Sequence, residues 1–90
     1  MHEMTAFQRD LLIVIAGLDA PAGTTINAEL DQYYEKTVEA GRLYPNLDDL
    51  VEQGIADKTA KDGRTNEYSV TDCGHTGLES HLDWKSALLD

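Results

Sequence analysis

The sequence predicts an α+β fold that is mostly helical, with three helices, a two-stranded hairpin and a final helix. Apolar residues recur at helical spacing in four segments, residues 5–18, 24–34, 39–54 and 72–89. The period changes to two, as in strands, over residues 55–59 and 66–70. A chain of 90 residues is long enough for one domain with a modest core.

The first predicted helix is apolar around almost its whole circumference. Thr5 is a suitable N-cap, and the apolar positions that follow are Phe7, Leu11, Leu12, Ile13, Val14, Ile15 and Leu18. A helix that is apolar on more than one side needs two packing partners, so we expect the core on one side and a second subunit on the other. Residues 1–3, before the cap, are expected to fray.

The next two helices form a helix-turn-helix arrangement. Residues 17–23 (GLDAPAG) have the composition of a loop, and Thr24 or Thr25 is expected to cap the helix that follows. A connector over residues 35–40 leads into a helix over residues 39–54. Two helices joined by a short link are typical of the helix-turn-helix motif, although this link is longer than the tightest ones.

The helix over residues 39–54 has a buried stripe and a polar N-terminal end. The stripe consists of Leu43, Leu47, Leu50 and Val51. Pro45 is expected in the first turn, and Gly54 is expected to end the helix. Arg42, Tyr44 and Asn46 lie at the N-terminal end, where a helix in a major groove contacts base edges. The same stretch also fits a core helix with an ordinary solvated face.

A hairpin with a basic tip follows the third helix. Its strands are predicted over residues 55–59 and 66–70, and Asp62 and Gly63 in the intervening segment (AKDGRT) favour a turn. Two strands alone are marginal, so the hairpin is expected to pack against the helices as a wing. Residues 1–71 are therefore expected to form a winged helix-turn-helix domain for DNA binding.

A last helix over residues 72–90 is expected to belong to the same single domain and to mediate dimerisation. Thr71 is a suitable N-cap, whereas Gly74 and Gly77 weaken the start of the helix. No later segment covers the apolar side of this helix, which favours a partner on another chain. The residues expected at the dimer interface are Leu11, Leu12, Leu78, Leu82, Trp84, Leu88 and Leu89.

The charge balance is unusual for a DNA-binding protein. The chain has 17 acidic residues against 7 Lys and Arg, whereas affinity for DNA comes largely from cations that neutralise phosphates. Most of the bases nevertheless lie between residues 36 and 64. Two classes of protein fit: a DNA-binding protein that works in molar salt, where surface charges are screened, or an acidic protein-interaction module or DNA mimic that does not bind DNA.

Three segments together resemble the PadR-like winged-helix transcriptional regulators. They are GRLYPNL at residues 41–47, LVEQGI at residues 50–55 and GRTNEYSVT at residues 63–71, followed by Gly74. The acidic composition is most similar to members of that family from salt-loving archaea. The resemblance implies a homodimer on an operator, with residues 42–46 in the major groove and residues 61–65 of the wing at the backbone or minor groove.

Two departures from the family pattern matter. Val70 stands where the family usually has leucine, and a single helix follows the wing where many relatives have a larger C-terminal region. The resemblance implies double-stranded DNA and a second copy of the chain as partners. The short C-terminal region argues against a ligand-sensing role, so we expect no obvious small-molecule effector, and we expect no cofactor. The expected role is that of a dimeric, sequence-specific repressor in a high-salt cytoplasm.

The residues expected to contact DNA are Thr24, Thr25, Asn27, Arg42, Tyr44, Asn46, Lys58, Lys61, Arg64 and Thr65. Arg42 is expected to bind guanine or a phosphate, with a solvated residue paired to Glu39 as the alternative. Asn46 suits adenine, and Tyr44 suits a phosphate. The wing cations are expected to neutralise phosphates, although ordinary hairpin charges would give the same pattern. The start of the second helix suits phosphate binding, and capping explains its polar residues almost as well.

No catalytic constellation is recognisable, and no enzyme activity is expected. Cys73 near a helix N-terminus suits either a redox switch or an ordinary structural role. Cys73, His75 and His81 lack a fourth ligand and a recognised spacing for a metal. One cysteine allows no internal disulfide, and the apolar run over residues 11–18 is too short to span a membrane, so we expect a cytoplasmic protein.

Overall fold

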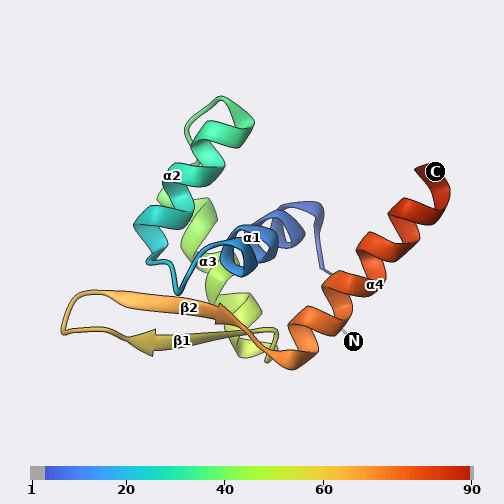
Figure 1. Cartoon of the computed structure of the whole chain (residues 1–90). Helices are drawn as coiled ribbons and strands as arrows, with labels where there is room; N and C mark the ends of the chain where they lie inside the picture. The colour runs from blue at the N-terminus through green and yellow to red at the C-terminus, as the bar shows by residue number, and fades with distance from the viewer. Residues whose placement is uncertain (1–3, 90) are drawn as a thin grey trace.

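The computed structural model describes residues 4–89, and the predicted fraying of residues 1–3 lies outside the described residues. The elements follow the order α1 (Ala6–Gly17), α2 (Gly23–Tyr34), α3 (Ala40–Glu52), β1 (Ala56–Ala60), β2 (Asn66–Val70) and α4 (Asp72–Leu89) (Figure 1). The predicted α+β, mostly helical class is confirmed. The hairpin projects from one end of the molecule and α4 projects from the other.

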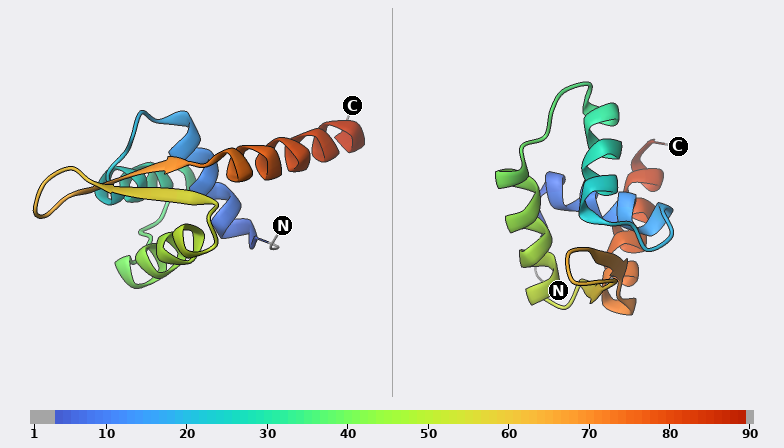
Figure 2. Two further views of the ribbon diagram at one scale, coloured as in Figure 1. Left: turned by 90° about the horizontal axis from the view of Figure 1, so that it is seen from below. Right: turned by 90° about the vertical axis from the view of Figure 1, so that its left-hand side faces the viewer.

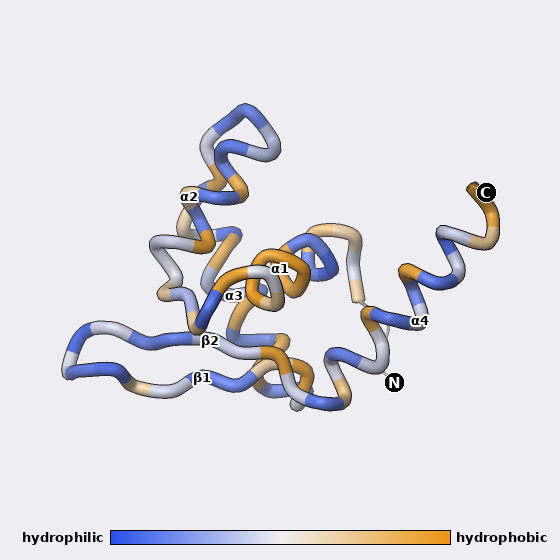
Figure 3. The backbone as a smooth tube through the Cα atoms, viewed as in Figure 1, coloured by the Kyte–Doolittle hydropathy of each residue, from blue (hydrophilic) through white to orange (hydrophobic). Residues whose placement is uncertain are grey.

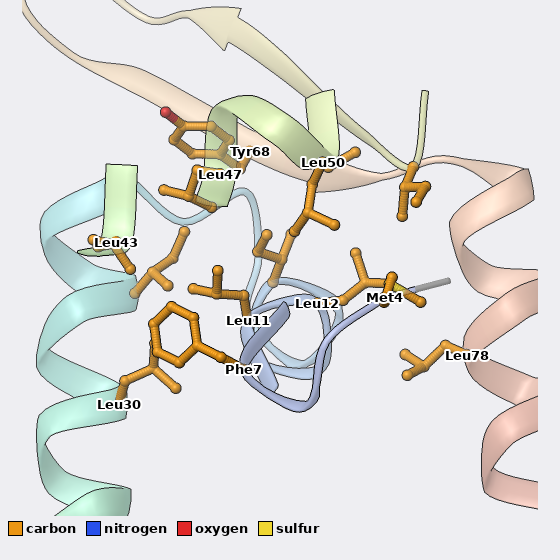
Figure 4. Packing of buried hydrophobic residues seen from close by; sticks show 14 of the residues in the cluster. Met4, Phe7, Leu11, Leu12, Leu30, Leu43, Leu47, Leu50, Tyr68 and Leu78 are labelled. Atoms are coloured by element: carbon orange, nitrogen blue, oxygen red, sulfur yellow. The ribbon is translucent and has the colours of Figure 1, made fainter. Parts of the chain in front are cut away.

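Helix α1 lies at the centre of the molecule. Thr5 caps it as predicted, because the Gln8 N–H donates to Thr5 Oγ1 at 3.1 Å and the Thr5 N–H donates to Gln8 Oε1 at 3.2 Å. The helix contacts α2, α3, β2 and α4 of the same chain, and Figure 4 shows its apolar side chains in the core that these elements enclose. Leu11 and Leu12 are 0% exposed, so the prediction that they face a second subunit is wrong. Ile13, on another side of α1, is 43% exposed, so the expected contact of that side with a second subunit stays a prediction.

Helix α2 begins earlier than the sequence predicts. Its first residue is Gly23 and its N-cap is Ala22, which makes no side-chain capping bond. The prediction that Thr24 or Thr25 caps α2 is therefore wrong, and both threonines lie in the first turn with exposed side chains.

Side-chain hydrogen bonds fix the link between α2 and α3. Glu35 ends α2 in the left-handed conformation, with φ of 57°. Asp31 Oδ1 accepts hydrogen bonds from the Val38 N–H at 2.6 Å and from Asn27 Nδ2 at 3.0 Å. Asn27 Nδ2 also donates to the Val38 carbonyl at 3.1 Å. The link therefore has defined bonds to α2, which set where α3 starts.

Helix α3 has the predicted buried stripe. Its fully buried side chains, each 0% exposed, are Leu43, Leu47 and Leu50. Pro45 lies one turn further into the helix than predicted, because the helix begins at Ala40. The missing N–H of the proline removes the bond to the carbonyl four residues earlier. Gly54 follows the end of α3 with φ of 75°, as predicted for a glycine stop.

Strands β1 and β2 form the antiparallel hairpin, with Ala56 opposite Val70 and Ala60 opposite Asn66. The hairpin rests on the helices through Tyr68, which is 3% exposed. The Tyr68 ring lies beside Leu47 in Figure 4. This burial gives the predicted wing the support that two isolated strands lack.

The connector between α1 and α2 pairs with β2, which the sequence did not predict. The Tyr68 N–H donates to the Pro21 carbonyl at 3.0 Å, and Ala22 forms an isolated antiparallel bridge with Glu67. These contacts place the N-terminus of α2 beside the wing.

Helix α4 starts directly on the sheet. Thr71 caps it, because the Gly74 N–H donates to Thr71 Oγ1 at 3.1 Å while the Thr71 hydroxyl donates to the Gly54 carbonyl at 2.7 Å. A Cβ on Gly74 would overlap the Ile55 carbonyl oxygen and lie 2.7 Å from Val70 Cγ1. Only glycine allows α4 to approach the sheet this closely.

The second half of α4 projects from the body of the molecule (Figures 1 and 2). Leu78 is 6% exposed and belongs to the core, so the prediction that it faces a second subunit is wrong. Beyond it, exposure rises to 45% for Leu82, 60% for Trp84, 66% for Leu88 and 83% for Leu89. Figure 3 shows apolar residues at the far end of this arm. Between residues 4 and 89, no helix combines the length and apolar character that crossing a membrane requires.

Candidate nucleic-acid interface

A cavity of about 120 Å³ lies between the N-terminus of α2, helix α3 and the wing. Four of the residues predicted to contact DNA line it, namely Thr24, Tyr44, Arg64 and Thr65. They come from three parts of the chain, and the fold brings them together at the end of the molecule from which the wing projects (Figure 2). This cavity marks the centre of the candidate interface.

Tyr44 lies against the first residue of α2. A Cβ on Gly23 would lie 2.7 Å from Tyr44 Cε1 and 2.8 Å from Tyr44 Oη, so a larger residue at this position would displace the Tyr44 ring. Because the N-cap of α2 makes no side-chain bond, the first N–H groups of the helix are available to an anion. The sequence did not show this contact of Gly23 with Tyr44, because the composition of residues 17–23 indicated only a loop.

Asp62 shapes the tip of the wing. Its Oδ1 accepts hydrogen bonds from the Arg64 and Thr65 N–H groups, each at 2.8 Å. These bonds favour the charged carboxylate and hold the pKa of Asp62 below its usual value. The Lys61 N–H donates to the Thr65 carbonyl at 2.8 Å. The tip is therefore closed by a side chain, and Gly63 does not have the positive φ of a two-residue hairpin turn.

Two of the wing cations lie beside carboxylates. Lys58 Nζ is 3.9 Å from Asp48 Oδ1, and Lys61 Nζ is 3.8 Å from Glu67 Oε2. Exposed pairs of this kind are weak, so either lysine can exchange its carboxylate for a phosphate at little cost. Arg64 takes part in no ion pair within the described residues, which leaves its guanidinium available at the tip.

Arg42 and Asn46 lie on the α1 side of α3, away from Tyr44. Arg42 Cζ is 3.9 Å from the centre of the Phe7 ring, which is a cation–π contact. Asn46 Oδ1 accepts from Gln8 Nε2 at 3.1 Å, and Asn46 Nδ2 donates to the Arg42 carbonyl at 2.7 Å. Both ends of the Asn46 amide are bonded within the protein. These bonds fix the orientation of the amide, and a contact with adenine would have to use its second N–H and the second lone pair of its oxygen.

Thr25 and Asn27 do not line the cavity. Thr25 is exposed in the first turn of α2. Asn27 donates to Asp31 and to the Val38 carbonyl, so its amide stabilises the link between α2 and α3. The sequence placed Asn27 correctly near the start of α2 but did not show that its amide is already bonded.

Among residues 4–89, no three His, Cys, Asp or Glu side chains are arranged to hold a metal ion. Cys73 is exposed on the first turn of α4. The His81 ring lies 5.8 Å from the Trp84 ring, measured between ring centres.

Comparison with known proteins identifies relatives of the chain. The family model described as Transcriptional regulator PadR-like family matches residues 11–80. RosR of H. salinarum is 45% identical, with a TM-score of 0.89, over 94% of this chain and 76% of that chain. No curated protein gives a significant sequence match.

Two solved complexes share the fold at lower identity. Streptococcus pneumoniae FabT in complex with DNA has a TM-score of 0.77 at 17% identity, over 97% of this chain and 58% of that chain. Bacillus subtilis PadR in complex with operator DNA has a TM-score of 0.72 at 18% identity, over 90% of this chain and 48% of that chain. At these identities the likeness concerns the fold alone.

Proposed function

The chain belongs to the PadR-like family of transcriptional regulators, and we propose that it binds a specific operator as a homodimer and represses transcription. The observation that carries the proposal is the convergence of Thr24, Tyr44, Arg64 and Thr65 on one cavity. Hydroxyl groups and a guanidinium at a helix N-terminus suit the phosphate backbone of duplex DNA.

Each part of this surface has a distinct role in the proposed complex. Arg64 supplies positive charge at the wing tip, while the Tyr44 hydroxyl and the first N–H groups of α2 donate to a phosphate. With the backbone held there, the N-terminal end of α3 enters the major groove and the wing follows the backbone or the minor groove.

The acidic surface supports function in a high-salt cytoplasm. Asp48 and Glu67 lie beside the wing lysines and would repel phosphates at low ionic strength. The Debye length falls to about 3 Å at 1 M salt, so this repulsion is confined to close contacts. The wing therefore contacts DNA at lower electrostatic cost in molar salt.

The far half of α4 supports the homodimer. Its large apolar side chains are exposed in the single chain, and such a surface suits a second copy. The proposed dimer surface consists of Leu82, Trp84, Leu88 and Leu89.

Fluorescence anisotropy with the duplex upstream of the protein's own gene tests the proposal, with a scrambled duplex for comparison and a series of KCl concentrations. The wild type is expected to prefer the operator in molar KCl. Arg64→Gln is expected to weaken binding and to reduce the slope of log K against log salt by about 0.9, the value for one phosphate contact. Lys85→Gln on α4 is the control, because it removes the same charge away from the wing, and light scattering checks that it keeps the wild-type mass, since Lys85 lies between Trp84 and Leu88.

Equal affinity of the wild type for the operator and the scrambled duplex would overturn sequence-specific binding. An Arg64→Gln variant with the wild-type slope would show that the wing tip does not contact the backbone.

A further inference from the structure

A second cavity of about 240 Å³ lies on the other side of α3, between the start of α1, the end of α2 and the start of α3. The residues that line it are Ala6, Phe7, Asp10, Tyr34, Lys36 and Arg42. Two of them are cations, in a chain whose net charge is −10. This cavity is therefore a site of local positive charge on an acidic surface.

The guanidinium of Arg42 is held in place by Phe7. The Phe7 ring is 8% exposed, and Figure 4 shows it at the edge of the core near Leu30. Because core packing fixes the ring, the cation–π contact at 3.9 Å favours a position of the exposed Arg42 guanidinium over it, at the rim of the cavity.

Lys36 supplies the second cation of this cavity. Its N–H donates to the Asp31 carbonyl at 3.2 Å, which fixes its backbone just after the left-handed Glu35. Its side chain is exposed. In the part of the chain that the structure describes, neither Lys36 nor Arg42 takes part in an ion pair.

The carboxylate in the cavity already has a partner. The Tyr34 hydroxyl donates a hydrogen bond to Asp10 Oδ2. Burial is the largest cause that raises the pKa of Tyr34 to about 12, and this bond and the charge of Asp10 add to it. The hydroxyl therefore keeps its proton at physiological pH. Lys36 and Arg42 outnumber Asp10 among the charged residues of the lining, so the cavity can accept an anion.

The position of this cavity points to the nature of the anion. Arg42 and Tyr44 are two residues apart, so they lie about 200° apart around the axis of α3. Tyr44 faces the cavity beside the wing, and Arg42 faces the cavity beside α1. A helix in a major groove has a phosphate backbone on each side of it. Cations on both sides of α3 fit this geometry.

We propose that Lys36 and Arg42 bind the phosphate backbone of the operator on the side of α3 opposite the wing. The inference rests on the proposed function, since it requires α3 to lie in the major groove. It assigns Arg42 to positioning on the backbone instead of base reading, and it adds Lys36 to the interface. Each protomer then holds both backbones that border the groove.

The test measures DNA affinity by anisotropy on the operator and the scrambled duplex over a series of KCl concentrations. The variants are Lys36→Gln, Arg42→Gln and the double variant, with Lys85→Gln as the control of matched charge. The double variant is expected to reduce the slope of log K against log salt by about 0.9 or more, at least one phosphate contact. Both duplexes are expected to lose affinity by the same factor, because phosphate contacts do not distinguish sequences.

Arg42→Lys keeps the charge without the planar guanidinium, and it is expected to keep most of the wild-type slope. Lys36 is exposed on the link, so Lys36→Gln tests the site without disturbing the core. An unchanged slope in Lys36→Gln would overturn the proposal. So would an Arg42→Gln variant that loses affinity for the operator alone, since Arg42 would then read a base. A wild type that binds neither duplex would overturn the proposed function itself, whereas the two outcomes above overturn only the backbone contact of Lys36 and Arg42.

Discussion

The Gln8 side chain joins the cap of α1 to two polar side chains of α3, Asn46 and Asp49. Its oxygen closes the cap of α1, while its Nε2 donates to Asn46 Oδ1 at 3.1 Å and to Asp49 Oδ2 at 2.8 Å. Periodicity predicts that Asn46 lies on the polar side of α3. It does not predict this partner, because the two residues are 38 positions apart and meet only through the packing of α1 on α3. The polar side of α3 was therefore predictable from the sequence, whereas the hydrogen bonds that Asn46 already makes within the protein were not.

A substitution of Gly74 tests the close approach of α4 to the sheet. Gly74→Ala is expected to lower the free energy of unfolding by about 1–3 kcal/mol, because the new Cβ would overlap the Ile55 carbonyl oxygen and force α4 away from the sheet. Urea denaturation followed by circular dichroism measures this change. Gly41→Ala in α3 is the control: its Cβ meets nothing within 4 Å, so the variant is expected to gain up to about 1 kcal/mol. Equal stabilities for the two variants would show that the approach at Gly74 is not tight.

The elements themselves were predictable where one pattern determined them. Apolar spacing and a glycine stop located α3, and alternation around residues 62 and 63 located the hairpin within one residue. Helix α1 shows where such patterns fail. Its apolar circumference predicted that Leu11 and Leu12 face a second subunit, whereas elements of the same chain cover both residues and leave Ile13 43% exposed. A sequence reports how much of a helix is buried and does not report which chain buries it.

Substitutions in helix α4 test the proposed dimer. Replacing Trp84 and Leu88 by Ala is expected to convert a dimer to a monomer without loss of stability in the single chain, because both side chains are exposed there. Light scattering at tens of micromolar measures the mass. Leu78→Ala is the contrasting variant, expected to lower the free energy of unfolding by about 2–5 kcal/mol because Leu78 is in the core. A wild type that scatters as a monomer would refute the dimer.

For the molecule as a whole, the net charge determines the salt concentrations at which the fold is stable. The chain has a net charge of −10 within principal extents of 44 × 29 × 21 Å. At 0.01 M salt the Debye length is about 30 Å, so most of the acidic side chains repel one another across the molecule. At 1 M it is about 3 Å, and only adjacent charges interact. The composition alone predicts this behaviour, since it depends on the total charge more than on the fold.

The melting temperature is therefore expected to rise as KCl increases from about 0.01 M to about 1 M. Differential scanning calorimetry measures it. A variant with Glu52→Gln and Asp57→Asn, both exposed positions, is expected to melt higher than the wild type at low salt and to depend less on KCl. A melting temperature that does not change with KCl would exclude repulsion as the limit on stability.

The close approach at Gly74 also has a consequence for the operator. Because α4 starts directly on the sheet, the direction of the arm proposed to join two copies is set relative to the wing. Two copies joined through α4 then hold their α3 helices at one separation and one rotation about the duplex. The helical repeat of B-DNA is about 10–10.5 base pairs, so inserting half a repeat between two half-sites would turn one of them away from its protomer. A residue that touches no DNA thus restricts recognition to operators whose half-sites are in phase.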